Sequence, residues 1–226
     1  MVLRAKLLTE LVGSFVFMTV IALSGPIGSL APVAIGLALA AMVYMGGHVS
    51  GAHYNPAVSF GLLVRRVIDL RTMLLYWAAQ ALGALLAFAV ADLVGGRAAG
   101  IQPGTGVSWA AALTAEVVFT AALVLVVLNV AATRATAGNS FYGLAIGFTV
   151  AAGALAVGPI SGGAFNPAVG LGATAVAGIA GHGTWSTLWL YIVGPLAGAA
   201  IGAAVHGLQG PAIPVPPQQT EQMPQR

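Results

Sequence analysis

GAHYNPAVSFG occupies residues 51–61 of the chain, and a lightly edited copy, GGAFNPAVGLG, occupies residues 162–172. Both copies contain Asn-Pro-Ala, starting at Asn55 and again at Asn166. Asparagine caps the free backbone N–H groups at a helix start, and proline suits the first helical position because it has no N–H to satisfy. The repeat therefore predicts two helices that begin at these asparagines.

The composition around this repeat is that of a membrane protein. Of the 226 residues, 59% are apolar and 6% are charged, and the mean hydropathy is +0.96. Such a chain cannot be dissolved as an ordinary globular domain. The absence of cysteine excludes disulfides and thiolate metal sites. The net charge of +3 is read as a sign of membrane orientation, and no nucleic-acid partner is indicated.

Six apolar stretches are long enough to cross a bilayer, and two further stretches are too short. The short ones, residues 56–64 and 167–178, follow the two Asn-Pro pairs. Ten or so helical residues reach roughly 15 Å, half of a hydrocarbon core about 30 Å thick. We therefore expect an all-α membrane protein with six transmembrane helices and two re-entrant half-helices. The expected spans are residues 7–24, 31–49, 70–94, 109–131, 141–158 and 186–207.

The half-helices indicate an inverted internal duplication. An odd number of spans separates them, so each enters from its own side and the two meet near the midplane. Glu10 in the first span is echoed by Glu116 in the fourth.

The expected organisation is a single channel domain followed by a tail. The tail is rich in Pro and Gln and has almost nothing to bury, so it is expected to be disordered. The expected boundaries are residues 1–208 for the domain, about 1–100 and 108–208 for its two repeats, and 209–226 for the tail.

Basic residues predict the orientation, because Lys and Arg are enriched in cytoplasmic loops. Only Arg97 falls on the other side of a six-span model, so both termini are expected in the cytosol. Arg4 and Lys6 ahead of an apolar run also fit a signal peptide, but the echo of Glu10 in the fourth span favours half of a repeat. The residues on the cytosolic side are Arg4, Lys6, Arg65, Arg66, Arg71, Arg134 and Arg226.

Paired Asn-Pro-Ala half-helices within a six-span inverted repeat resemble the aquaporin, or major intrinsic protein, family. The resemblance covers nearly all of the chain up to about residue 207, including GHVSGAHY at residues 47–54. It implies a passive channel without a cofactor, a homotetramer with one pore per subunit, and a pore lined by His53. It also implies a central constriction at the two motifs, Asn55, Pro56 and Ala57 with Asn166, Pro167 and Ala168.

The chemistry of such a constriction follows from its helix ends. A helix amino end carries about half a positive charge, so two of them facing one narrow point oppose the entry of any cation, including a hydrated proton. Asn55 and Asn166 are expected to cap their own helices with the side-chain oxygen and to point their amide N–H groups at the lumen.

The second motif departs from the common family pattern. Most members follow it with Arg, which forms a selectivity filter with an aromatic or His residue of the second span and two further residues. The loss of Arg removes hydrogen-bond donors and an electrostatic barrier, which predicts a wider, more apolar filter. The four matching positions are Ile35, Ala154, Gly163 and Val169.

This filter is most similar to that of plant tonoplast intrinsic proteins, whose motif also reads Asn-Pro-Ala-Val but which keep His where Ile35 stands. That group passes water with ammonia, urea or hydrogen peroxide, and glycerol is a further candidate here. An apolar constriction can also exclude water by dewetting.

Two other functions remain open. Glu10 and Glu116 are carboxylates within apolar spans, where charge is costly. They either carry protons in a coupled secondary transporter or, as the resemblance implies, accept hydrogen bonds from the broken segments as structural residues. A non-conducting scaffold would also explain the altered filter. His48 and His53 are not expected to bind a metal, and the absence of a nucleophile with its base makes an enzyme the least favoured class.

Overall fold

The computed structural model describes residues 1–95, 100–181, 183 and 185–210, and in these ranges every regular element is a helix. Six helices are long and apolar enough to cross a membrane, and two shorter ones, α3 (Pro56–Val64) and α7 (Pro167–Ile179), follow the Asn-Pro pairs. The long helices are α1 (Leu3–Leu23), α2 (Ala31–Ser50), α4 (Leu70–Gly95), α5 (Trp109–Val127), α6 (Tyr142–Ser161) and α8 (Leu188–Leu208).

The predicted all-α fold of six spans and two half-helices is confirmed. Short turns that the sequence did not predict flank or extend the spans: three 3₁₀ turns, η1 (Gly25–Leu30), η3 (Arg134–Thr136) and η4 (Trp185–Thr187), and a π-helical turn, η2 (Leu128–Ala132), that continues α5. The predicted disordered tail falls largely on residues 211–226, which lie outside the described residues, as does Arg97.

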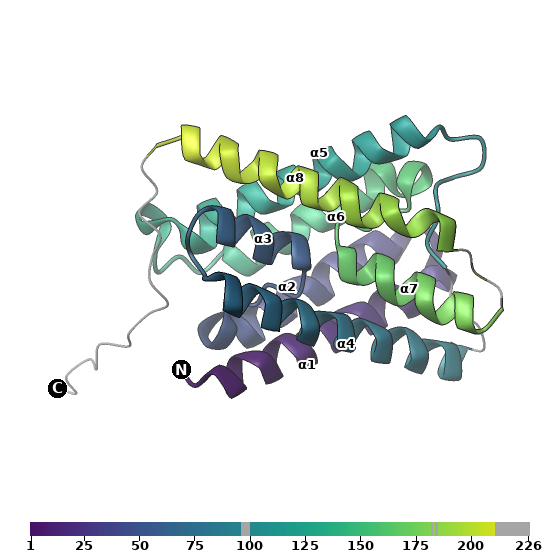
Figure 1. Ribbon diagram of the computed structural model, residues 1–226, viewed down its shortest axis with the longest axis horizontal. Coiled ribbons are helices and arrows are strands. Elements are labelled where there is room, and N and C mark those ends of the chain that lie inside the picture. Colours follow the sequence, from purple (N-terminus) through teal and green to yellow (C-terminus); the bar gives the residue numbers. More distant parts are fainter. Residues whose placement is uncertain (96–99, 182, 184, 211–226) are drawn as a thin grey trace.

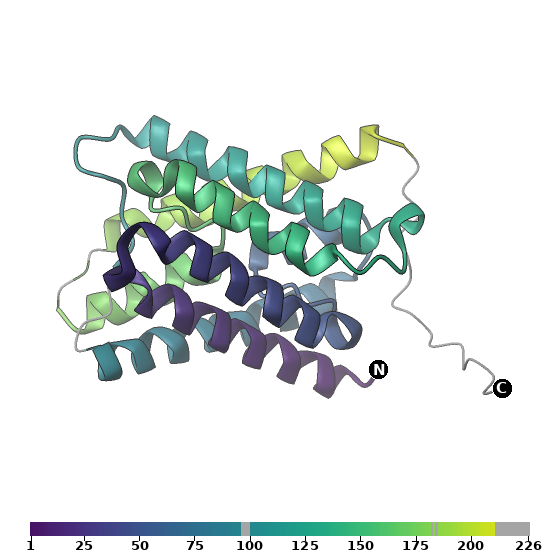
Figure 2. The same ribbon diagram turned by 180° about the vertical axis from the view of Figure 1, so that it is seen from behind.

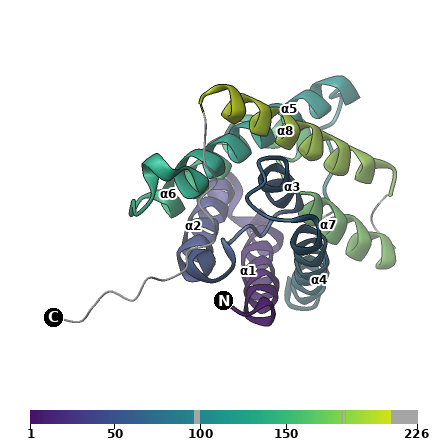
Figure 3. The ribbon, with the colours of Figure 1, turned by 60° about the vertical axis from the view of Figure 1, so that its left-hand side comes forward.

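The long helices pack in pairs that match between the two halves of the chain. α1 packs on α4 and α5 packs on α8, while α2 and α6 pack together where the halves meet, on the face seen in Figure 2. The half-helices enter from opposite ends and point their first residues at each other in the middle of the bundle (Figure 1). Both lie between α4 and α8 (Figure 3).

The contact between α2 and α6 depends on two facing glycines. A Cβ atom added to Gly36 would lie 2.6 Å from the Gly147 carbonyl oxygen, and a Cβ on Gly147 would collide with the Gly36 carbonyl oxygen in return. Small residues let helix backbones approach closely, and in lipid such packing is a main source of association. The pair therefore sets how closely the two halves approach each other.

One end of the bundle gathers the basic residues of the described chain. The N-terminus and the last turn of α8 both lie there (Figure 1). We call this end the basic end, and its Lys and Arg residues lie at element boundaries, where the charges can reach water. They are Arg4 and Lys6 in the first two turns of α1, Arg65 and Arg66 after α3, Arg71 at the start of α4, and Arg134 in η3.

Candidate pore

Both half-helices start with the asparagine cap that the sequence predicted. The Asn55 backbone is extended, and its Oδ1 atom accepts a hydrogen bond from the Ala57 N–H at 2.8 Å. Asn166 has the same conformation, and its Oδ1 accepts from the Ala168 N–H at 3.0 Å. Proline follows each cap, so the first helical residue has no N–H left to satisfy.

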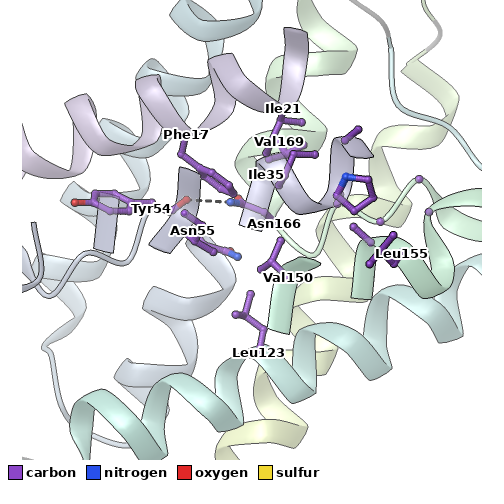
Figure 4. Close-up of a pocket in the computed structure, with 18 of the residues that line it drawn as sticks. Phe17, Ile21, Ile35, Tyr54, Asn55, Leu123, Val150, Leu155, Asn166 and Val169 are labelled. Carbon is purple, nitrogen blue, oxygen red and sulfur yellow. Dashed lines mark hydrogen bonds between the residues drawn. The ribbon is translucent and has the colours of Figure 1, made fainter. Parts of the chain in front are cut away.

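The two asparagines also bond across the middle of the bundle. Asn55 Nδ2 donates to the Phe165 carbonyl oxygen at 2.8 Å. Asn166 Nδ2 donates to the Tyr54 carbonyl oxygen at 2.9 Å, the bond drawn in Figure 4. An amide group has two N–H donors. One donor of each asparagine is therefore used by the opposite repeat, and only the second is left for the lumen, whereas both were expected to point there.

The carbonyl groups that accept these crossed bonds belong to strained residues. Tyr54 has a φ of 48° and Phe165 a φ of 50°, in the left-handed region that costs a side-chain-bearing residue about 1–2 kcal/mol. Such strain persists only where surrounding contacts fix the backbone. Here the carbonyl of each residue is held by an asparagine and its N–H by a buried carboxylate.

Glu10 is the carboxylate that holds the first loop. It is fully buried, and it accepts hydrogen bonds from the His53 N–H at 3.0 Å, the Tyr54 N–H at 2.8 Å and the Ser50 hydroxyl at 2.6 Å. A buried carboxylate needs such partners to offset its lost hydration. These loop N–H groups would otherwise be unsatisfied inside the membrane.

Glu116 repeats this arrangement in the second half. It is also fully buried, and it accepts from the Ala164 N–H at 3.0 Å, the Phe165 N–H at 2.8 Å and the Ser161 hydroxyl at 2.7 Å. The two carboxylates therefore fix the backbone that presents the crossed carbonyl groups.

The first repeat adds a polar network that the second does not match. Gln80 Nε2 donates to Glu10 at 2.8 Å and to the Ser59 hydroxyl at 3.1 Å, and the same hydroxyl lies 2.9 Å from His53 Nδ1. On α4, Gln80 lies four residues after Tyr76, whose hydroxyl donates to the Ser50 carbonyl. On α8, Pro195 lies four residues after Tyr191, whose hydroxyl donates to the Ser161 carbonyl, so a proline stands where the first repeat has the glutamine. The side chain of His53 is thus held by the Ser59 hydroxyl, which Gln80 links to Glu10, and the proline in the second repeat offers Glu116 no matching amide.

A cavity of about 530 Å³ surrounds the meeting point of the half-helices. Asn55, Asn166 and His53 line it. Its other walls are largely apolar, and the described residues that line it include no Asp, Glu, Lys or Arg. Figure 4 shows apolar side chains around the two asparagines, among them Phe17, Ile21, Leu123, Val150 and Leu155.

All four predicted filter positions lie on this cavity. Ile35 comes from α2, Ala154 from α6, Gly163 from the loop before α7, and Val169 from the first turn of α7. The side chain of Val169 is 2% exposed, so it is packed into the wall. No side chain in this set supplies a hydrogen-bond donor.

The remaining predicted site residues lie in packed surroundings. Ala57 and Ala168 are 0% and 1% exposed and belong to the apolar core. Pro56 and Pro167 are buried at the first position of each half-helix, and the Pro56 carbonyl accepts from Trp77 Nε1 at 2.9 Å. His48, which was not predicted to line the lumen, is exposed in the last turn of α2.

Sequence reasoning missed several polar residues of this site. Ser50 and Ser161 stand at the same distance before the two asparagines, so the repeat contained the signal for both. Gln80 is a lone amide in an apolar span, which marks a functional or structural contact in a membrane. The crossed carbonyl bonds had no signal, because backbone atoms are the acceptors.

Six spans with two capped half-helices meeting at a cavity define a membrane channel of the aquaporin type. The family model described as Major intrinsic protein matches residues 3–206, and the chain belongs to this family, as predicted. The protein is an integral multi-pass membrane protein and a passive channel for water or small solutes. The family consists of transporters rather than enzymes.

Individual relatives agree with this assignment. The chain is 40% identical over 198 residues to Probable aquaporin TIP3-2 of Oryza sativa subsp. japonica, covering 86% of this chain and 73% of the relative. It is 39% identical over 175 residues to Aquaporin NIP1-1 of the same plant, covering 76% of this chain and 60% of that one. The X-ray structure of the aquaglyceroporin from Plasmodium falciparum shares the fold, with a TM-score of 0.75 and 24% identity over 91% of this chain and 96% of its own.

Proposed function

We propose that this channel conducts small neutral solutes together with water through the described cavity. The observation that carries the proposal is that both asparagines and all four filter positions line one cavity whose described walls hold no charged side chain. In this assignment Asn55 and Asn166 form the constriction, and Ile35, Ala154, Gly163 and Val169 form the filter. An ion entering an apolar filter loses hydration without compensation, whereas a neutral solute loses far less.

The substrates follow from the chemistry of the filter. A filter without donors cannot replace the hydrogen bonds of a strongly hydrated solute, so weakly hydrated or small solutes are favoured. Relatives named as TIP aquaporins support water, and a neighbour in fold is named as an aquaglyceroporin. Ammonia, urea and hydrogen peroxide fit this apolar filter, and glycerol is the largest solute that we include.

Cation exclusion is proposed to arise at the half-helix ends. The amino ends of α3 and α7 both face the cavity through their asparagine caps. Their partial positive charges add at one point of low dielectric and repel protons and metal cations. Each remaining asparagine N–H supplies a donor to a passing oxygen.

The decisive experiment measures solute fluxes in proteoliposomes by stopped-flow light scattering. Water, urea, glycerol, ammonia and hydrogen peroxide are tested in turn against protein-free vesicles, with a pH-sensitive dye inside to report proton leakage. We expect flux above background for water and at least one neutral solute, without proton leakage. Vesicles that match the background for every solute would contradict conduction and support the scaffold interpretation.

The coupled-transporter interpretation requires a carboxylate that is free to change its partners. Glu10 and Glu116 each accept two backbone N–H bonds and a serine hydroxyl, which supports a structural role for both. Uphill accumulation of a solute driven by a pH gradient would overturn that role.

The orientation, assembly and domain limits are also proposals. The basic end is proposed to face the cytosol, because six Lys and Arg residues gather there. Family membership supports a homotetramer with one pore per subunit. One channel domain over residues 1–208, with repeats of about 1–100 and 108–208, is supported by the matching bonds of Glu10 and Glu116.

A further inference from the structure

A second polar cluster, outside the cavity, joins three elements at the basic end. Arg65, which follows α3, donates from Nε to Nδ1 of His206 on α8 at 3.1 Å. His206 Nε2 lies 2.8 Å from the hydroxyl of Thr133, and this hydroxyl donates to the Leu128 carbonyl at 2.9 Å. The end of α3, the last turn of α8 and the π-helical turn η2 are therefore linked by one chain of hydrogen bonds.

These bonds define the protonation state of His206. An arginine N–H can only donate, so His206 Nδ1 must carry a lone pair. A neutral imidazole with a free Nδ1 has its proton on Nε2. That proton faces the Thr133 oxygen, whose own hydrogen is directed at Leu128. The cluster in this structure is thus built for a neutral histidine of one tautomer.

A second proton on His206 would break the cluster. It would place an N–H on Nδ1 directly opposite the Arg65 N–H and a positive ring beside a guanidinium group. His206 is 3% exposed, so water does little to screen this repulsion. Among the described residues, Arg65 is the charged group that acts on His206, and no carboxylate balances its positive charge. On the other side of the ring, Thr133, which follows η2, presents a neutral hydroxyl.

The cluster bears directly on the position of α3. This helix has nine residues, and so short a helix does not hold its place by its own stability. The amino end of α3 presents Asn55 to the cavity, and Arg65 follows its carboxyl end. A Cβ added to Gly207 of α8 would lie 3.0 Å from the Arg65 Nη1 atom. The guanidinium group is therefore packed against the α8 backbone, and a shift there moves α3 along its length.

The structure on the α5 side of the cluster is also built from side-chain bonds. The wider π turn frees carbonyl groups, and Asn139 and Thr136 satisfy those of Val130 and Asn129. Asn129 Nδ2 in turn donates to Gln209 Oε1 after α8 at 3.0 Å. π turns inside helices are frequent at functional sites. These bonds join α5 and α8 independently of His206, so breaking the cluster releases α3 rather than the bundle.

We propose that Arg65, His206 and Thr133 are positioning residues that hold α3, and with it Asn55, in the conducting arrangement only while His206 is neutral. Acidification at the basic end then detaches Arg65 and lowers conduction. This inference rests on the conduction pathway proposed above.

The first test compares solute flux at pH 7.5 and pH 4.5 in proteoliposomes, with either face acidified separately. Wild-type flux is expected to fall about twofold or more when the basic end is acidified, because the second proton on His206 breaks its bond to Arg65 and places two positive groups side by side. His206→Gln cannot take up a proton, and its flux is expected to stay constant with pH. The matched control is His48→Gln, since His48 is an exposed histidine at the same end of the bundle.

The second test reads the tautomer directly and does not depend on conduction. Nitrogen-15 solid-state NMR of histidine-labelled protein, assigned by the difference from His206→Gln, is expected to show His206 with a bare Nδ1 and a protonated Nε2 at pH 7.5. Arg65→Gln is expected to remove the preference for this tautomer and to flatten the pH profile of the flux.

The outcomes separate this inference from the proposed function. A protein without flux but with the expected tautomer defeats the proposed function and leaves the geometry of the cluster standing. A conducting protein whose flux is equal at both pH values, or whose pH dependence survives in His206→Gln, overturns the inference. A His206 that carries its proton on Nδ1 at pH 7.5 overturns it as well.

Discussion

At the scale of single residues, Val169 is the member of the proposed filter that departs most from the common family pattern. It packs into the cavity wall within one turn of Asn166, at the position that the sequence matches to the arginine of the common family pattern. A valine there gives no donor and no positive charge that would repel cations. The proposed exclusion of cations is therefore left to the half-helix ends and the apolar walls.

Val169→Arg is expected to reduce the flux of urea and glycerol about tenfold, the effect of a barrier raised by about 1.4 kcal/mol. The larger, charged side chain narrows the opening and binds passing oxygens. Stopped-flow measurements on proteoliposomes check this, and Val169→Leu is the control that adds bulk without charge. An unchanged solute profile in Val169→Arg would show that another site limits passage.

Arg66 is a second residue whose effect can be isolated. It closes α3 with a φ of 59°, where its N–H bonds to the Leu63 carbonyl and the next N–H bonds to the Leu62 carbonyl. Helix ends of this kind favour glycine, and Gly181 has the left-handed conformation just after α7.

Arg66→Gly is expected to stabilise the protein by about 0.5–1 kcal/mol, because the left-handed strain is relieved. Thermal unfolding in detergent measures the effect. Arg66→Ala removes the same charge but keeps the Cβ atom, so it should give no gain. Equal melting temperatures for Arg66→Gly and Arg66→Ala would contradict the inference that the left-handed backbone at Arg66 is strained.

At the scale of elements, the first re-entrant loop is fixed by the helices packed around Tyr54. A Cβ on Gly13 of α1 would overlap the Tyr54 ring, and a Cβ on Gly46 of α2 would overlap the Tyr54 hydroxyl. Its hydroxyl donates to the Met42 carbonyl at 3.1 Å. The packing of α1 on α2 thus holds the residue whose carbonyl binds Asn166.

Gly13→Ala is expected to lower stability by about 1–3 kcal/mol through overpacking, and to reduce flux as Tyr54 is displaced. Gly95→Ala at the end of α4 is the control, because Gly95 does not line the cavity and a Cβ there makes only an ordinary contact, 3.5 Å from Leu23 Cδ2. The melting temperatures of both variants in detergent, with their water flux, test this. A Gly13→Ala protein as stable and active as the control would show that the loop tolerates movement of Tyr54.

The elements also show how far the sequence could predict the site. The Asn-Pro pairs located the starts of α3 and α7 because capping is a local property of the chain. The π turn after α5 and the Arg65–His206 contact could not be predicted, since both depend on residues brought together by packing. The sequence also predicted four filter positions that lie on one cavity. It could not predict that one N–H of each asparagine amide is bonded to a carbonyl group of the opposite repeat, because those carbonyl groups are distant in the chain.

At the scale of the whole molecule, the absence of cysteine allows a direct test of orientation. Thr105 lies exposed between α4 and α5, and Ser140 lies exposed between η3 and α6 at the basic end. A single introduced cysteine is then the only thiol in the chain.

In intact cells a membrane-impermeant maleimide is expected to label Thr105→Cys and to leave Ser140→Cys unlabelled until the cells are opened, because basic loops stay in the cytosol. Gel-shift analysis of the labelled protein reads the result. The reverse labelling pattern would place the basic end, and the His206 cluster, outside the cytosol.

The crossed asparagine bonds have a consequence for synthesis of the chain. Asn55 and the Tyr54 carbonyl find their partners more than a hundred residues downstream. While the ribosome is still making the second half, the first half therefore lies in the membrane with these polar groups lacking their hydrogen-bond partners, which costs free energy in lipid. Folding of the first half is therefore completed only after the second half has inserted. A prematurely terminated polypeptide keeps unsatisfied polar groups in the membrane, which membrane quality control can recognise.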